Sequence, residues 1–129
     1  MDGQQEKMLV DAINRVVSNT NDKVCLGTKE LTLSATAQSL SFASLVNGST
    51  QTDVHSVTIK VKPAGTPTDA THLVRYTQAD GDTPTTTHGM WQGAVDYFEI
   101  NNVNNVKNAL FISADGGFHI LTIEYYGKN

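Results

Sequence analysis

The sequence predicts an all-β protein, an antiparallel β-sandwich or jelly roll with an N-terminal amphipathic helical arm. Three observations predict it. Apolar and polar residues alternate from residue 23 onward, the alternating segments are short, and no later segment is long enough to be the helix of a parallel crossover. A chain of 129 residues, 39% of them hydrophobic, has the size and apolar content of one domain with one core. We divide it into a helical arm with a linker, residues 1–22, and a β-sandwich domain, residues 23–129.

The arm is expected over Glu6–Ser18. Its apolar side chains recur at three- and four-residue spacings, which is typical of a helix with one apolar stripe. Polar residues that favour turns then end the helix at Ser18–Asp22. The stripe either caps the sandwich of its own chain or packs against symmetry mates or another protein. The candidate partner-binding residues on it are Leu9, Ile13, Val16 and Val17.

The rest of the chain reads as half-buried strands separated by turns. Strands are expected at Leu31–Leu33, Leu40–Phe42, Val57–Val61, His72–Tyr76, Val95–Ile100, Ala109–Ser113 and Phe118–Tyr126. Turn residues gather at Asn47–Ser49, Pro63–Pro67, Asp80–Pro84, Asn101–Asn105 and Asp115–Gly117. Because Ala114–Gly117 lies between two strong strand signals, it is the clearest predicted hairpin.

Charge and composition argue against several classes of protein. The 9 Lys and Arg residues are outnumbered by 13 Asp and Glu residues, the formal net charge is −4, and no basic run is present, so we expect no nucleic-acid partner. No apolar run approaches the ~20 residues of a membrane helix. Met1–Lys7 lacks the pattern of a secretory signal, so we expect synthesis and assembly in a cytoplasm. The single cysteine, Cys25, is expected to be a small buried residue.

The histidines do not form a metal-binding motif. His55 and His119 lack ligand spacing, and each is interpreted as a hydrogen-bonded or surface histidine. His88 lies in the longest loop near Asp80 and Asp82, where a dyad with a threonine nucleophile is conceivable, but no catalytic motif supports it. The Asp80–Asp82 segment is interpreted as a turn, because the spacing of a calcium loop is absent.

Acidic residues on the strands offer no stronger catalytic signal. Asp96, Glu99 and Glu124 are the candidates for a carboxylate pair, and outward solubilising positions explain them more simply. The glycines occur in turns that no helix follows, so they do not form a phosphate cradle. We therefore expect no enzymatic activity, no cofactor and no metal.

Trp91 is the one aromatic residue with two distinct interpretations. It lies in a stretch bracketed by Gly89 and Gly93, between two predicted strands. It can be a core side chain beneath a long loop, or an exposed aromatic at a contact surface that anchors a protein or sugar partner.

The order of features over residues 57–126 resembles that of small structural proteins encoded by tailed bacteriophages. The matching pieces are Val74–Tyr76, the turn Asp80–Thr85, the glycine-bracketed Gly89–Gly93, Val95–Ile100, Leu110–Ile112 and the closing Ile123–Tyr126. Asp82 lengthens the acidic turn relative to that pattern, and the N-terminal helix is not part of it. The resemblance implies a virion component and not a catalyst.

Two functions of different classes follow. The first is a capsid decoration or accessory protein, located in the virion, that forms a homo-oligomer, with a trimer favoured, and binds the major capsid protein or neck and tail proteins. The alternative is a carbohydrate-binding module on a tail or fibre. It would use Trp91 with Tyr97 or His88 for stacking, and Asp80 and Asp82 as acceptors for sugar hydroxyls.

Overall fold

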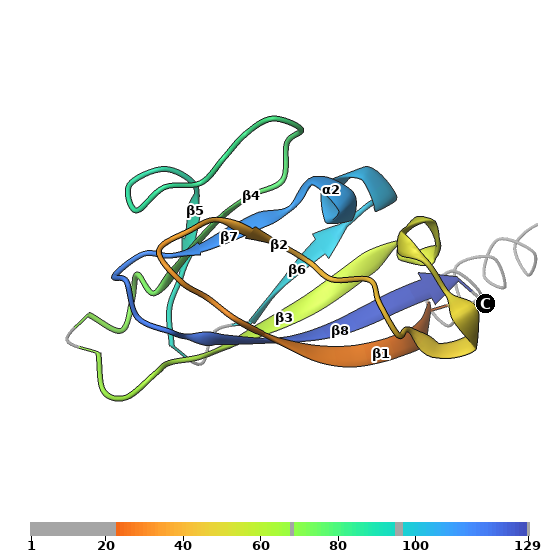
Figure 1. Ribbon diagram of the computed structural model, residues 1–129, viewed down its shortest axis with the longest axis horizontal. Coiled ribbons are helices and arrows are strands. Elements are labelled where there is room, and N and C mark those ends of the chain that lie inside the picture. Colours follow the sequence, from red (N-terminus) through yellow and green to blue (C-terminus); the bar gives the residue numbers. More distant parts are fainter. Residues whose placement is uncertain (1–22, 68, 95–96, 129) are drawn as a thin grey trace, which may run out of the picture.

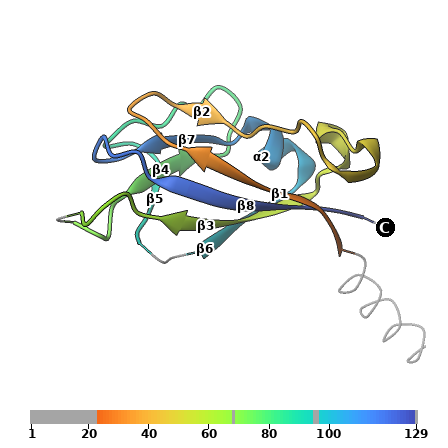
Figure 2. The ribbon, with the colours of Figure 1, turned by 60° about the horizontal axis from the view of Figure 1, so that its bottom comes forward.

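The computed structural model describes residues 23–67, 69–94 and 97–128, and these form two antiparallel four-stranded sheets (Figures 1 and 2). The strands are β1 Lys23–Thr32, β2 Gln38–Ser39, β3 Ser56–Lys62, β4 Val74–Thr77, β5 Met90–Gln92, β6 Tyr97–Asn101, β7 Leu110–Ser113 and β8 Ile120–Lys128. The predicted all-β antiparallel sandwich is confirmed. The predicted arm and its four apolar residues, Leu9, Ile13, Val16 and Val17, lie outside the described residues.

Most strands that are neighbours in a sheet come from distant parts of the chain. Sheet A has the order β1-β8-β3-β6, and sheet B has the order β2-β7-β4-β5. Within these sheets β1 pairs with β8, β2 with β7, β3 with β6 and β4 with β5, so the pairs are nested one inside the next. The pairs β3–β8 and β4–β7 complete the sheets. Only β4 and β5 pair as consecutive strands of the described chain.

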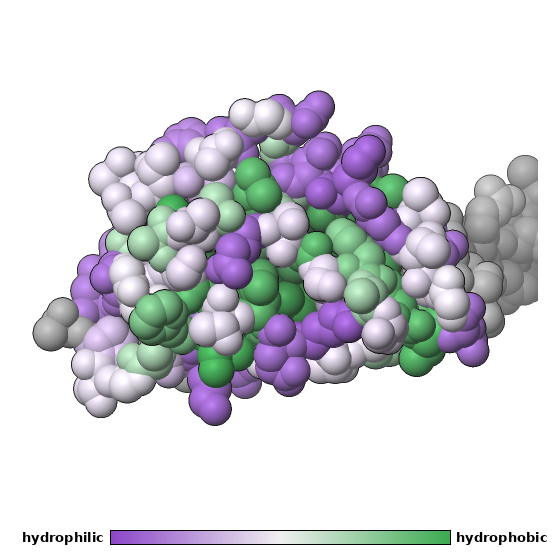
Figure 3. Space-filling view, in the orientation of Figure 1, coloured by the Kyte–Doolittle hydropathy of each residue, from purple (hydrophilic) through white to green (hydrophobic). Residues whose placement is uncertain are grey.

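The core lies between the two sheets and follows from the alternation in the sequence. On β3 the side chains of Val57, Ile59 and Val61 are buried while Lys60 is exposed, as predicted. Each buried aliphatic side chain of this kind stabilises the fold by about 1.5–3 kcal/mol. In the view of Figure 3, hydrophobic residues show along a band between the sheets, among hydrophilic ones.

An aromatic cluster joins the two sheets at the centre of the core. Tyr76 of β4 stacks on Phe98 of β6, with ring centroids 4.5 Å apart. Phe111 of β7 lies 6.0 Å from Tyr76 and 6.5 Å from Phe98. Because Phe98 belongs to sheet A and the other two rings to sheet B, these contacts fix the sheets against each other.

Some predicted elements differ from the structure. Leu40–Phe42 is not a strand, because this segment packs on the core as a loop. The asparagine-rich turn contains a short helix, α2 Val103–Asn108, whose N-terminus is capped by the Asn102 side chain. Two 3-10 helices, η1 Val46–Gly48 and η2 Gln51–Asp53, precede β3. The hairpin predicted at Ala114–Gly117 is wrong, because β7 and β8 belong to different sheets.

Candidate functional site

The longest connection of sheet B, residues 78–89 between β4 and β5, is shaped by hydrogen bonds of its own polar residues. The Asp82 N–H donates to the Ala79 carbonyl, which closes the predicted turn. The Thr77 hydroxyl donates to the Asp82 carbonyl at 2.6 Å. Further along, the Thr85 hydroxyl oxygen accepts from the N–H groups of Thr87 and His88. These bonds give the loop a defined shape without a hydrophobic core of its own.

The loop brings His88 and Asp82 together. The His88 Nε2 lies 2.7 Å from the Asp82 carboxylate, and both side chains are partly exposed. Of the two aspartates considered as partners of His88, the structure therefore selects Asp82 and not Asp80. The hydroxyls of Thr77 and Thr85 are engaged with backbone groups of the loop. The pair thus acts as a clamp across the loop, which becomes an ion pair when the imidazole is protonated.

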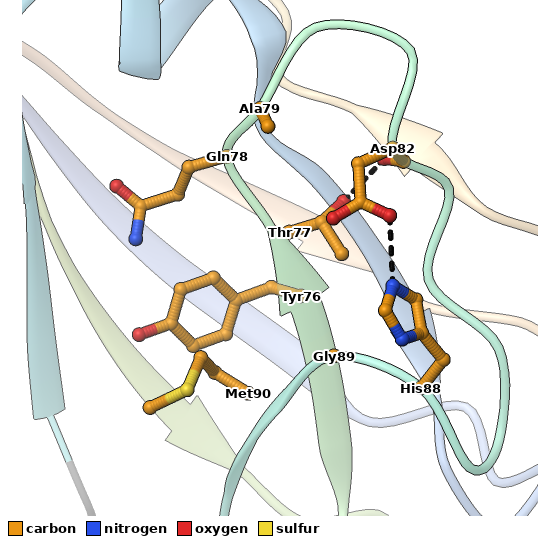
Figure 4. Close-up of a pocket in the computed structure, with 8 residues that line it drawn as sticks. All are labelled: Tyr76, Thr77, Gln78, Ala79, Asp82, His88, Gly89 and Met90. Atoms are coloured by element: carbon orange, nitrogen blue, oxygen red, sulfur yellow. Dashed lines mark hydrogen bonds and ion pairs between the residues drawn. The ribbon is translucent and has the colours of Figure 1, made fainter.

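A pocket of about 360 Å³ lies beside this clamp. It is lined by Tyr76, Thr77, Gln78, Ala79, Asp82, His88, Gly89 and Met90. Figure 4 shows the Tyr76 ring, Met90 and Gln78 on one side of β4, and Thr77, Asp82 and His88 on the other. The lining therefore combines the apolar side chains of Tyr76 and Met90 with the polar pair of Asp82 and His88.

Trp91 is on the surface, so its interpretation as a core side chain is wrong. Its side chain is 46% exposed, and its ring packs on His72 with centroids 4.3 Å apart. The His72 Nδ1 lies 3.3 Å from the Asp69 carboxylate. A hydrogen bond from the Thr71 N–H, supplemented by His72, holds the pKa of Asp69 below its usual value. The charged Asp69 thus orients His72, and His72 supports the indole.

Arg75 lies directly opposite Trp91 in the β4–β5 register and was not among the predicted site residues. Its Nη1 donates to the Gly89 carbonyl at 2.8 Å, while its Nε is buried without a hydrogen-bond partner in the described part of the chain. The ion pairs between described residues all involve a histidine, so none of them neutralises this guanidinium. The alternation of Val74, Arg75 and Tyr76 in the sequence predicts that Arg75 lies on the outer face of the strand. It does not indicate that the Arg75 guanidinium has no ion-pair partner.

The aromatic residues proposed for sugar stacking do not converge. Trp91 shares a row with Arg75 and Ile112 on the outer face of sheet B. Tyr97 pairs with Lys60 on the outer face of sheet A, where it is 72% exposed. The aromatic contact that the structure gives to Trp91 is therefore with His72, and Tyr97 lies on the other sheet.

Of the predictions for His119 and Cys25, the first is confirmed and the second is wrong. His119 is buried and hydrogen-bonded on both ring nitrogens, as expected for a satisfied core histidine. Cys25 is exposed, so the prediction of a buried cysteine is wrong. A register shift between Cys25 and Gly27 places Leu26 in the core and leaves Cys25 near the Glu124 carboxylate, 3.9 Å away.

The two strand carboxylates that the structure describes, Glu99 and Glu124, lie on an outer sheet face. Glu99 and Glu124 both pair with Thr58 on the outer face of sheet A, and both are exposed. Asp96 lies outside the described residues. In the described ranges, no group of three or more His, Cys, Asp or Glu side chains is arranged to hold a metal ion.

We compared the chain with models of protein families, with curated proteins and with solved structures, and none of the three comparisons found a match. None of the described helices is long and apolar enough to cross a membrane.

Proposed function

We propose that this chain is a structural component of a tailed-bacteriophage virion, a capsid decoration or accessory protein that forms homo-oligomers. The observation that carries the proposal is the nested strand pairing of β1 with β8, β2 with β7, β3 with β6 and β4 with β5. An eight-stranded ribbon folded in this way is a jelly roll, an architecture that recurs in viral capsid domains. The resemblance of residues 57–126 to small phage structural proteins points in the same direction.

The position of β1 supports a role in assembly. This ten-residue strand lies at the edge of sheet A and directly follows the predicted arm. Long edge strands present backbone groups that pair readily with another chain. An arm attached at this edge is well placed to contact a neighbouring copy, the major capsid protein or a neck or tail protein.

The test is association with particles. We expect the double variant Leu9→Asp, Ile13→Asp to lose co-sedimentation with virions in lysates of producing cells, because charges on the apolar stripe prevent its burial. The circular dichroism spectrum and melting temperature should stay those of the parent chain. Phe118→Asp, which changes an exposed residue before β8 that is 66% accessible, is the control and should still co-sediment. Unchanged incorporation of the double variant would contradict the proposal.

A further inference from the structure

We propose that the outer face of sheet B at the β4–β5 edge binds a saccharide that carries a carboxylate, such as a uronic or sialic acid. The site consists of Trp91, Arg75 and His72. It is a second function of this fold and does not depend on where the chain sits in a virion.

Trp91 provides a stacking surface that is already held in place. Nearly half of the side chain is exposed, and the contact with His72 supports the ring from one side. Apolar faces of sugar rings stack on exposed aromatic side chains of this kind. Because the indole is oriented before the ligand arrives, little side-chain freedom is lost on binding.

Arg75 provides the charge that selects the ligand. Residues directly opposite each other on neighbouring strands have Cβ atoms roughly 5 Å apart, so a sugar ring on Trp91 has its substituents within reach of Arg75. Arg75 as a residue is partly exposed although its Nε is buried, and its one hydrogen bond among the described residues goes to the neutral Gly89 carbonyl. A guanidinium forms its strongest and best-oriented bonds with a carboxylate. Among the described residues no carboxylate pairs with Arg75, because Asp69, the acidic residue next to the site, is paired with His72.

His72 adds a polar group at the rim. Its Nδ1 is taken by Asp69, while its Nε2 has no partner within the described ranges and can bond a sugar hydroxyl. A nucleic acid also stacks on aromatic rings, but it requires several cations along its backbone. With one arginine at the site and a formal net charge of −4 for the chain, a single carboxylate on a sugar is the better fit.

The test uses the full chain and its only tryptophan, Trp91, as a fluorescent reporter. Titration with oligogalacturonate should quench or shift the emission, and the fully methyl-esterified oligomer of the same length should bind at least about tenfold more weakly. Sialyllactose against lactose tests the second source of the carboxylate in the same way. Oligothymidylate tests the nucleic-acid alternative.

Variants assign the effect to residues. Arg75→Gln should remove the preference for acid over ester, and Arg75→Lys should retain part of it. Trp91→Ala, measured by calorimetry, should abolish binding. Tyr97→Ala, which removes an even more exposed aromatic on the other sheet, should leave binding unchanged. Melting temperatures should confirm that each variant is folded.

Four outcomes would overturn the inference. They are no binding of either acidic saccharide, equal binding of acid and ester, preferential binding of oligothymidylate, and unchanged binding by folded Trp91→Ala. None of these results bears on co-sedimentation with virions, so the two proposals fail independently.

Discussion

A single carboxylate oxygen ties the connection between β7 and β8 to the rest of the fold. Oδ1 of Asp115 accepts from the Gly117 N–H at 2.8 Å, the Ser113 hydroxyl at 3.1 Å and the His119 Nε2 at 2.7 Å. The other ring nitrogen of His119 accepts from the Ala64 N–H at 3.0 Å, so the proton resides on Nε2. One cluster therefore joins this connection to the loop that follows β3.

The Asp115 cluster predicts a loss of stability in acid. Desolvation raises the pKa of Asp115, but the hydrogen bonds from Gly117 and His119 outweigh it and hold the pKa below its usual value. Since the folded-state pKa is lower than the unfolded one, the stabilisation is complete above that unfolded value and is lost as the pH falls through the folded one. Urea unfolding at pH 7 and pH 3 should show a smaller pH dependence for Asp115→Asn than for the parent chain.

Asp80→Asn, on the exposed turn of the β4–β5 loop, serves as the matched control and should keep the pH dependence of the parent. If Asp115→Asn kept it as well, the proposed role of this carboxylate would be wrong.

Local sequence patterns predict where the strands lie more reliably than they predict which strands pair with each other. The alternation of Val57, Ile59 and Val61 depends only on the two faces of one strand, so it was readable directly. The chain does bend at Ala114–Gly116, but a turn signal does not say whether the next strand pairs with the last one or crosses to the other sheet. Long-range burial decides that choice.

Two further sequence predictions, for Leu40–Phe42 and for the asparagine-rich turn, are wrong for local reasons. The segment around Ser41 alternates like a strand, yet the Tyr125 hydroxyl donates to the Ser41 carbonyl at 2.6 Å and holds the segment as a loop on the core. Asparagines favour both turns and helix N-termini, and Asn102 begins α2 by accepting from the Asn104 N–H. The composition of a turn and of a capped short helix is nearly the same.

Gly89 predicts a specific weakness in the β4–β5 loop. Its φ is +119°, and a Cβ there would lie 2.9 Å from the Tyr76 carbonyl oxygen. Gly89→Ala should therefore destabilise the protein by well over about 1 kcal/mol, because strain and a backbone clash add. Gly48→Ala is the matched control, with φ +69° but open space around the new methyl group. Equal losses of unfolding free energy in the two variants would contradict the close approach.

Across the whole fold, only part of the candidate site could be predicted from the sequence. Trp91 stood out because it is the single tryptophan between two glycines, and the structure places it on the surface. Arg75 was missed because an unpaired charge depends on cross-strand register, which the sequence alone does not reveal. Cys25 was misplaced for a related reason, since the register shift in β1 turns it outward.

The nested pairing is compatible with both proposed contacts, because it separates two surfaces of the chain. Sheet A ends at the long strand β1, next to the predicted arm, and sheet B ends at β5, which carries Trp91. An assembly contact at the β1 edge leaves the outer face of sheet B open to a ligand. Jelly rolls occur in both capsid and lectin domains, and this division of surfaces accommodates both roles.

The central claim is that the chain assembles through its arm, and its most direct test is the solution mass. Light scattering should be measured on the full chain and on a chain that starts at Lys23. We expect a trimer or a larger ring for the full chain and a monomer for the shortened one, because we propose that the apolar stripe of the arm supplies the contacts between copies. A monomeric full chain, or an oligomer that survives removal of the arm, would contradict this account.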